Sequence, residues 1–331
     1  MKTDEMSKPK VVAVSGADGF IGRNLCATLS GGGFIVRPIY GPRWQGNCAE
    51  SDHCFRVDFN RELPPNRALE GCDVLIHLAG IAHRFNGTDR GAIARINGHV
   101  PSSLARRAHQ LGVRRFLFMS SAAVIPLIGT KPTGRMNDDA QEDEYGCAKL
   151  VAERELQEVA SETGIEAVVL RPPAVYGPGA PGRLSQLMRL IHLGVPFPSA
   201  CNKRSLIGIE NLIDFLILCS RHPAAAGQAF SLSDCEPSSS EIIRLLAQGM
   251  RRTPVFLPLP QSVVSLCFGM FGRARSASHY FDSFVVDSEA AHRLLGWVPR
   301  KPAPEGLRET GAHFAQSVRD RTAKPRPNWI D

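Results

Sequence analysis

The sequence VVAVSGADGFIGRNLCATLSGGGFIVRPIY, residues 11–40, predicts a strand, a turn, a helix and a second strand in succession. Its first apolar run is followed by a glycine-rich turn and then by a segment of helical periodicity, which breaks at Gly31–Gly33 before the second apolar run. Two consecutive strands joined by one helix form a parallel βαβ unit, because parallel strands need a crossover connection. This stretch therefore predicts an α/β protein.

The same alternation continues for more than a hundred residues. Further strands are expected at Cys54–Val57, Asp73–Leu78, Phe116–Met119 and Ala167–Leu170, and helices over Ala92–Leu111 and Tyr145–Thr163. This order predicts a doubly wound parallel sheet. After RPPAVYGPG (171–179) the alternation becomes irregular. We therefore expect a sheet domain over residues 9–175 and a smaller mixed lobe over 176–320, some segments of which return to the sheet.

Composition narrows the class of protein. The chain has 331 residues, 43% of them hydrophobic, which is enough for a substantial core. Its net charge of +7 is dispersed and its aromatic content is 7%, so an anionic small ligand is favoured over nucleic acid. Apolar runs fall short of the roughly 20 residues of a membrane span, and the polar start MKTDEMSKPK does not resemble a signal peptide. A soluble cytoplasmic protein without a membrane partner is expected.

The cysteines predict neither a disulfide framework nor a metal site. There are nine of them, an odd number, scattered without a C-x-x-C pair or a histidine at zinc-ligand spacing. We expect them to be reduced thiols, and we expect no metal.

The glycine turn predicts a dinucleotide site. Gly16, Gly19 and Gly22 form G-x-x-G-x-x-G between a strand and a helix, with Phe20 and Ile21 between the last two glycines. Glycines let the backbone approach a pyrophosphate, whose charge is stabilised by the N–H groups at the start of the helix. The alternative is an ordinary tight strand-to-helix turn.

The region after the second strand bears on the type of cofactor. NAD-binding proteins usually carry a carboxylate there, which binds the adenosine ribose. Here the sequence has Arg37 and Arg43 and no carboxylate until Glu50. Arginine suits a 2′-phosphate, so NADPH acceptance is favoured over strict use of NADH, unless both arginines are surface charges. Asp58 and Phe59, after the third strand, are expected at the adenine, although Asp58 could be a simple turn residue.

A tyrosine and a lysine four residues apart suggest acid/base chemistry. Tyr145 and Lys149 project from one face of the expected helix, because residues i and i+4 are neighbours on a helical surface. Ser120 and Ser121 follow the strand Phe116–Met119, at the edge where open parallel sheets bind ligands. Serine, tyrosine and lysine are therefore expected to meet at the nicotinamide.

The chain resembles the extended short-chain dehydrogenases/reductases of the NAD-dependent epimerase/dehydratase family, which have a Rossmann fold and act on nucleotide sugars. The motifs that carry the resemblance occur in order from about residue 11 to 312: SGADGFIG, DVLIHLAG, RINGHV, FLFMSS, Tyr145 with Lys149, LRPPAVYGPG, KRSLIGIENLIDF and HRLLGWVPRKPAPEGLRET.

The resemblance implies a role for each matching residue. Tyr145 would be the acid/base, Lys149 would bind the nicotinamide ribose and favour the phenolate, and Ser121 would hydrogen-bond the reacting oxygen, with Ser120 as the alternative. Asn97 would support the site, or else would be a helix-capping residue.

Further binding roles follow from the same resemblance. Leu78, Ala79 and Gly80 would line the ribose and phosphate side of the cofactor, and Pro172 would lie in the segment that holds the nicotinamide amide. Arg204 would meet the substrate diphosphate, or else form a surface ion pair. Two residues are expected to be structural rather than reactive, His77 and Tyr176.

Departures from subfamily patterns limit the reaction. Ala122 and Ala123 stand where 4,6-dehydratases carry an Asp and a Glu and where fucose-type epimerase/reductases carry a Cys. The chemistry left needs only a hydride and one proton. The resemblance favours reduction of a UDP-linked 4-keto-6-deoxy-N-acetylhexosamine to UDP-N-acetylquinovosamine or its C4 epimer, in surface polysaccharide or lipopolysaccharide (O-antigen) biosynthesis.

Two other functions stay open at this point, and so does the oligomeric state. One is a UDP-glucose or UDP-N-acetylglucosamine 4-epimerase with tightly bound NAD. Another is a nucleotide-binding protein without catalysis, which would normally have lost part of the Ser, Tyr and Lys set. Family members commonly dimerise through the helix that carries Tyr145, so a homodimer stands beside a monomer.

Overall fold

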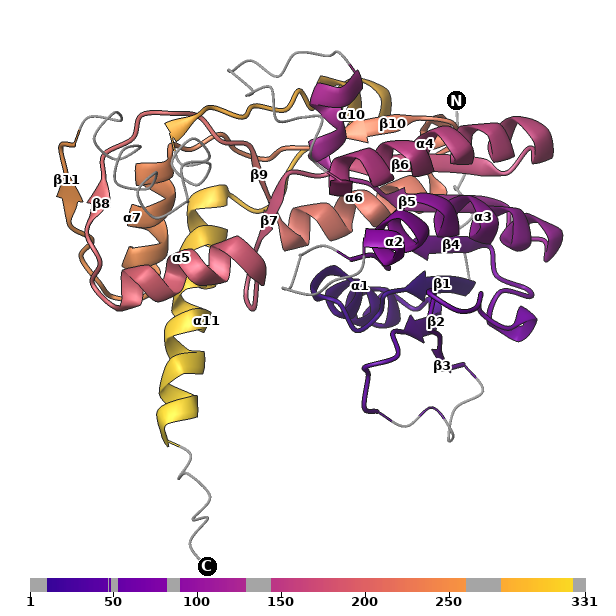
Figure 1. The fold of residues 1–331 in the computed structure, drawn as a ribbon, viewed down its shortest axis with the longest axis horizontal. Helices are drawn as coiled ribbons and strands as arrows, with labels where there is room; N and C mark the ends of the chain where they lie inside the picture. The colour runs from indigo at the N-terminus through magenta and orange to yellow at the C-terminus, as the bar shows by residue number, and fades with distance from the viewer. Residues whose placement is uncertain are drawn as a thin grey trace, which may run out of the picture. The chain divides into compact units, whose positions relative to one another are not determined.

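The protein contains a seven-stranded parallel sheet. The computed structural model describes residues 11–46, 48, 53–81, 90–128, 144–259 and 281–323. The strand order is β10-β6-β5-β4-β1-β2-β3, with every neighbouring pair parallel (Figure 1). The strands are β1 Val11–Ser15, β2 Ile35–Tyr40, β3 Phe55–Arg56, β4 Val74–His77, β5 Arg115–Met119, β6 Glu166–Arg171 and β10 Ala229–Ser231. The predicted doubly wound α/β class is thereby confirmed.

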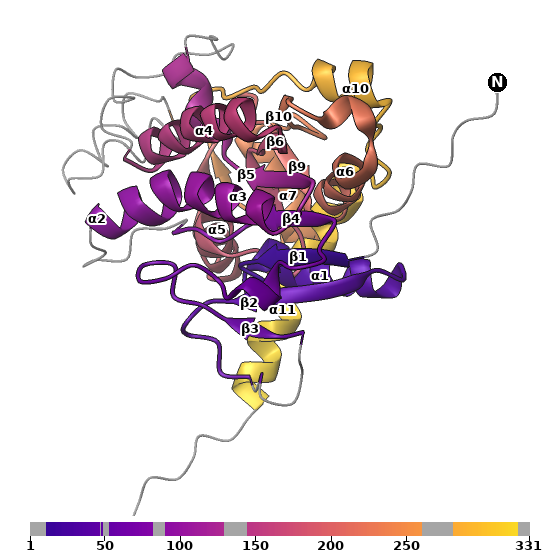
Figure 2. The same ribbon diagram turned by 90° about the vertical axis from the view of Figure 1, so that its right-hand side faces the viewer.

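Helices cover both faces of the sheet. On one face lie α1 (Phe20–Gly31) and α6 (Ile209–Arg221), and on the other α3 (Val100–Gln110) and α4 (Glu144–Thr163) (Figure 2). On the face of α3 and α4, side chains of both helices form a core with Phe116 and Phe118 of β5. The central strands thus have helices packed on both sides.

The predicted helix over Ala92–Leu111 is interrupted. The chain forms α2 (Arg90–Ile93), a π-helical segment η2 (Ala94–His99) and then α3. Extra backbone in a π-helical turn redirects the side chains that it carries, and such turns occur often at functional sites. Here the redirected and fully buried residue is Asn97.

The chain divides into two compact units that are discontinuous in sequence. The first comprises the described residues of Met1–Pro173, Ile209–Ser233 and Val286–Val298, and the second those of Ala174–Gly208, Asp234–Val285 and Pro299–Asp331. The first unit contains the whole seven-stranded sheet. It also contains η1 (Asn66–Ala68), η3 (Ala122–Ile128), η5 (Pro223–Ala225) and α10 (Glu289–Leu295).

The second unit is a mixed α/β lobe with its own core. Its helices are α5 (Gly182–His192), α7 (Ser239–Gly249) and α11 (Ala303–Ala323), and two parallel pairs join β7 (Ala174–Tyr176) to β9 (Leu206–Gly208) and β8 (Phe197–Pro198) to β11 (Phe256–Leu257). Helices α7 and α11 pack backbone to backbone: a Cβ on Gly249 would lie 1.9 Å from the Arg308 carbonyl oxygen, and one on Gly311 2.1 Å from that of Leu246.

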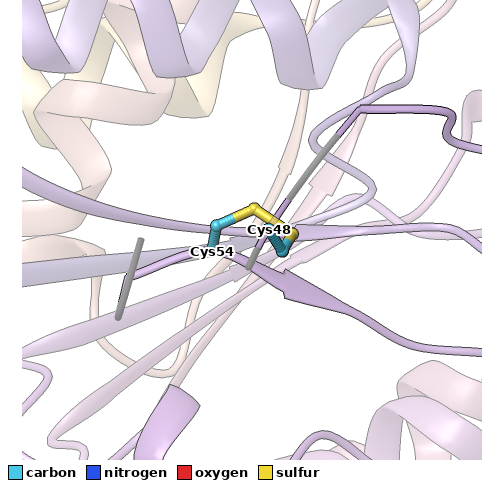
Figure 3. Close-up of a disulfide and its surroundings, with 2 residues drawn as sticks. All are labelled: Cys48 and Cys54. Atoms are coloured by element: carbon cyan, nitrogen blue, oxygen red, sulfur yellow. A yellow bond between two sulfur atoms is a disulfide. The ribbon is translucent and has the colours of Figure 1, made fainter. Parts of the chain in front are cut away.

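The expectation that all cysteines are reduced is wrong for one pair. Cys48 and Cys54 form a disulfide between the end of β2 and β3, with their Cα atoms 5.1 Å apart (Figure 3). The two residues are six positions apart, and no sequence pattern marks a pair that a single loop brings together. The free cysteines of the described residues are Cys26, Cys72, Cys147, Cys201, Cys219 and Cys235.

Two further expectations concern the described residues only. No helix among them is long and apolar enough to cross a membrane. No group of three or more His, Cys, Asp or Glu side chains within the described ranges could hold a metal ion.

Candidate functional site

The glycine turn between β1 and α1 is a backbone cradle that excludes side chains. Gly16 has a φ of +71°, and a Cβ added to it would lie 2.7 Å from the backbone nitrogen of Ala79. A Cβ on Gly22 would lie 2.1 Å from the Gly16 carbonyl oxygen. Helix α1 begins at Phe20, directly after this turn, so its free N–H groups are available to an anion. The turn therefore fits the pyrophosphate of a dinucleotide.

A second close approach lies beyond β4. A Cβ on Gly80 would lie 2.9 Å from Asn97 Oδ1 and 3.5 Å from Lys149 Nζ. Asn97 holds this segment by its backbone, since its Oδ1 accepts the Ile81 N–H at 2.9 Å and its Nδ2 donates to the Ile81 carbonyl at 3.0 Å. The structure thus brings Gly80, Asn97 and Lys149 together and leaves room between them only for a glycine. Leu78 and Ala79 lead into this point from the end of β4.

Lys149 is buried beside Tyr145 on α4. Its Nζ donates to the Met119 carbonyl at 2.8 Å and lies 4.6 Å from the centre of the Phe118 ring and 6.0 Å from that of Tyr145. Tyr145 itself is half-buried, so its ring is partly accessible while Lys149 is enclosed. The helical spacing therefore places the two side chains on one face, as the i, i+4 rule predicts.

Two opposing effects act on the pKa of Lys149. Burial lowers its pKa from 10.5 to about 7, and the Glu153 carboxylate opposes this shift. A protonated Lys149 stabilises the phenolate of Tyr145, and a neutral one does not. Lys149 can therefore change its protonation close to neutral pH.

The two serines after β5 have different surroundings. Ser120 is buried and donates its hydroxyl hydrogen to Glu153 Oε1. Ser121 is half-buried, and its Oγ accepts the Ala123 N–H at 3.2 Å. Because Ser120 is committed to a buried carboxylate, Ser121 is the better candidate for a hydroxyl that meets a substrate.

Ala122 brings no acid or base to this edge. It is buried, and its N–H donates to the carbonyl of Pro172 at 2.9 Å. This bond ties the segment after β5 to the segment after β6, and so it positions Pro172 at the same edge of the sheet as Ser121. Ala123, half-buried beside them, also lacks a titratable group.

His77 is a fully buried residue of β4. Burial lowers its pKa to about 3, so it is neutral at physiological pH. Its Nδ1 lies 2.6 Å from Ser15 Oγ, and its ring stands edge-on to Phe59 at 5.6 Å. Its Nε2 has no hydrogen-bond partner among the described residues. These contacts join β1 to β4 beneath the glycine turn, which agrees with a packing role.

Asp58 and Phe59 lie after β3. Asp58 Oδ1 accepts the Asn60 N–H at 3.0 Å, and its Oδ2 lies 3.5 Å from Arg61 Nε. Phe59 is buried in the core. The geometry gives Asp58 the role of a turn residue, and its contact with adenine stays a prediction.

Arg37 lies where it is not expected. Its Nη1 donates to the carbonyls of Arg67 at 3.0 Å and Glu70 at 2.5 Å. It stands in the middle of β2 rather than at the carboxyl end, where a 2′-phosphate would be bound. Arg43, which is exposed and follows that end, is the better candidate for such a contact.

A carboxylate that sequence reasoning missed lies at the end of β2. Asp18, inside the glycine turn, accepts the N–H of Gly41 at 3.0 Å through Oδ1. Gly41 directly follows β2, so Asp18, in the turn after β1, brings a carboxylate next to the carboxyl end of β2. The preference for NADPH over NADH stays a prediction.

Arg204 belongs to the second unit. It is half-buried, and its Nη1 donates to the Asp282 carbonyl at 3.1 Å. Burial lowers its pKa, the like charge of Arg183 lowers it further, and the Asp282 carboxylate opposes both shifts. Two guanidinium groups held near each other repel, and an anion such as a diphosphate relieves that repulsion. Tyr176 of this unit is a core residue whose hydroxyl donates to Asp234 Oδ2 at 3.1 Å.

Glu153 and Arg171 are two more residues that sequence reasoning missed. Arg171 Nη2 lies 2.6 Å from Glu153 Oε2, and Arg171 Nε lies 3.1 and 3.2 Å from the two carboxylate oxygens. A signal was available for Glu153, because it follows Lys149 by the same four residues that separate Lys149 from Tyr145.

The comparisons with known proteins agree with this arrangement. The model of the NAD dependent epimerase/dehydratase family matches residues 12–232. A UDP-glucose 4-epimerase of Vibrio cholerae is 32% identical over 329 residues, which cover 96% of this chain and 99% of the relative. A ceramide reductase of Caulobacter vibrioides is 27% identical and covers 90% of this chain and 89% of its own.

A solved structure agrees at the level of the fold. The crystal structure of a UDP-glucuronic acid 4-epimerase from Bacillus cereus, in complex with NAD, has a TM-score of 0.72 at 19% identity. It covers 95% of this chain and 99% of its own.

Proposed function

Because this chain belongs to the NAD dependent epimerase/dehydratase family, we propose that it transfers a hydride between a nicotinamide dinucleotide and C4 of a UDP-linked sugar. The observation that carries this proposal is the pair of Tyr145 and Lys149 on α4, with Lys149 Nζ 6.0 Å from the tyrosine ring and next to Gly80. A buried ammonium beside a half-buried phenol suits proton transfer near neutral pH.

The residues that would hold the cofactor lie in the glycine turn after β1 and around Gly80 after β4. Gly16, Gly19 and Gly22 would admit the pyrophosphate, and Lys149 would donate to the nicotinamide ribose while Asn97 fixes the backbone around it. When bound, the reduced cofactor supplies the hydride for the reaction. The cofactor we expect is NADH, because the Asp18 carboxylate would accept from the ribose hydroxyls and repel a 2′-phosphate.

The leading reaction is reduction of a UDP-linked 4-keto-6-deoxy-N-acetylhexosamine to UDP-N-acetylquinovosamine or its C4 epimer. Hydride would reach C4 while Tyr145 gives its proton to the C4 oxygen and Ser121 donates a hydrogen bond to that oxygen. Alanines at positions 122 and 123 support this choice, because dehydration and epimerisation beside a keto group need a further acid or base. We place this reaction in the cytoplasmic steps of surface polysaccharide synthesis.

The diphosphate of the substrate would be bound in the second unit. The like charges of Arg183 and Arg204 favour an anion there, and guanidinium groups bind phosphate oxygens in a bidentate manner. This chemistry fits a nucleoside diphosphate and does not select the sugar.

A second candidate is a UDP-hexose 4-epimerase. It is favoured by the relative from Vibrio cholerae, which matches almost the whole chain. An epimerase oxidises C4 and then reduces its other face, so it uses the same Tyr145 and Lys149 and needs no net cofactor.

One experiment separates the two candidates. Purified protein is mixed with NADH or NADPH and the UDP-linked 4-keto sugar, and the absorbance of the reduced nicotinamide is followed. The reductase predicts consumption of the cofactor equal to the product formed. The epimerase instead predicts NAD that copurifies, and interconversion of UDP-glucose with UDP-galactose without added cofactor. If neither reaction occurs, the assignment to C4 chemistry fails.

A further inference from the structure

Helix α4 presents three polar side chains on one face, of which the proposed function uses only two. Tyr145, Lys149 and Glu153 follow one another at intervals of four residues. Lys149 and Glu153 are both buried. Burying an unpaired carboxylate costs free energy, so the contacts of Glu153 indicate its role.

Both oxygens of Glu153 are occupied by donors from the ends of neighbouring strands. Ser120, directly after β5, donates to Oε1, and Arg171, the last residue of β6, donates to both oxygens with a closest distance of 2.6 Å. This bidentate ion pair fixes the carboxylate geometrically. It also joins α4 to the two strand ends that lead to Ser121 and Pro172.

Glu153 is also the negative charge that acts on Lys149. Among the described residues, the titratable groups near Lys149 are His77 on β4, which is neutral, and Tyr145 on α4 itself. From β5 it meets the Met119 carbonyl and the ring of Phe118. Burial disfavours the protonated form of Lys149, and Glu153 favours it.

We propose that Glu153 is a positioning residue, which keeps Lys149 protonated for the proposed reaction, and that Arg171 holds and partly neutralises it. The inference rests on the proposed roles of Tyr145 and Lys149. It adds that the ion pair of Glu153 with Arg171 sets the pH range in which Tyr145 and Lys149 can act. Glu153 follows Lys149 by one turn of α4. An ion pair with a structural role alone would join α4 to the ends of β5 and β6 without changing the protonation of Lys149.

The test exploits the opposite signs of the two partners. Glu153→Gln removes the negative charge and leaves the Arg171 cation, so Lys149 should lose its proton at lower pH. Arg171→Gln leaves the Glu153 carboxylate without compensation, so Lys149 should keep its proton to higher pH. Each shift is expected to be on the order of one pH unit, as for charges about a helical turn apart at an effective dielectric constant near 20.

The readout must not depend on the reaction. The Lys149 titration is followed by NMR in protein with isotope-labelled lysine, and Lys149→Met identifies the resonance. Shifts in opposite directions support the proposal. Shifts in the same direction, or no shift, overturn it, because both variants break the same ion pair and a structural role would affect both alike.

Activity provides the second readout. In the reducing direction Tyr145 and Lys149 both need their protons, so kcat/KM falls at high pH. That fall should move down in Glu153→Gln and up in Arg171→Gln. Arg171→Lys keeps the charge, so it should restore the wild-type profile even if the other variants fold poorly. Opposite NMR shifts without turnover of any UDP sugar would sink the proposed function and leave this inference standing.

Discussion

The two halves of the sheet edge are built by different means. Around β1 and β2, the site is shaped by the lack of side chains: Gly16 and Gly22 admit no Cβ, and the polar group at that end, Asp18, is exposed. Around β5, β6 and α4, the site consists of buried polar groups that satisfy one another, among them Lys149 and Glu153. Substitutions that add side-chain volume should therefore disturb the first half most, and substitutions that remove a charged or polar group should disturb the second half most.

The largest effect is expected at the charge-sensitive half. Tyr145→Phe removes one hydroxyl and no packing, so it should lower kcat by roughly 10²–10⁴-fold, as the loss of a general acid does. NADH affinity, measured by fluorescence titration, should be close to that of the wild type. A variant with wild-type kcat would show that the proton comes from another group.

A matched pair of glycines tests the volume-sensitive half. Gly22→Ala would place a methyl group 2.1 Å from the Gly16 carbonyl, whereas Gly31→Ala, in the same helix, meets nothing within 4 Å. Gly22→Ala should lower the free energy of unfolding by about 1–3 kcal/mol and weaken NADH binding. Gly31→Ala should leave binding unchanged. Equal NADH affinities in calorimetric titrations of the two variants would contradict the cradle.

The charge at the end of β2 offers a finer distinction. Asp18→Asn keeps an acceptor for the Gly41 N–H and removes the charge, so NADPH should bind about tenfold more tightly relative to NADH, a change of about 1.4 kcal/mol. Arg37→Gln is the control, because Arg37 donates to the 67–70 carbonyls. Its ratio of dissociation constants should equal that of the wild type. If this ratio changed in Arg37→Gln and not in Asp18→Asn, the 2′-phosphate would bind at Arg37 on β2 instead.

The smallest expected effect concerns His77. The pKa of His77 is lowered to about 3 in the folded protein, from 6.5. As the pH falls, His77 is therefore protonated in the unfolded chain before it is protonated in the folded protein. The free energy of unfolding decreases as the pH falls from 6.5 towards 3. Unfolding by denaturant at a series of pH values should show a slope smaller by about one proton in His77→Gln. The exposed His109→Gln, on α3, should keep the wild-type slope; an unchanged slope in His77→Gln would show that His77 is not the group responsible.

Local patterns predicted much of the fold. The βαβ unit of residues 11–40 and the helix that starts beside Tyr145 follow from periodicity and glycine placement, and both are found at β1–α1–β2 and α4. The interruption of the 92–111 helix by η2 was not predictable in this way, because a π-helical turn leaves no periodic signal.

The candidate site was predicted less completely than the fold. Tyr145 and Lys149 are close in sequence, so their proximity follows from helical geometry alone. Asp18 with Gly41, and Glu153 with Arg171, are joined by tertiary contacts between elements, and one sequence does not show which strand ends meet. The same holds for the disulfide of Cys48 with Cys54, which depends on the path of one loop.

The central claim is hydride transfer at C4 with Tyr145 as the proton donor. It is tested most directly by mixing wild type and Tyr145→Phe separately with NADH and the UDP-linked 4-keto-6-deoxy-N-acetylhexosamine and following both nicotinamide absorbance and the sugar product. The account predicts that the wild type oxidises one NADH for each sugar reduced at C4, and that Tyr145→Phe does so at least about a hundredfold more slowly. No NADH oxidation by the wild type, or equal rates in the two proteins, would contradict it.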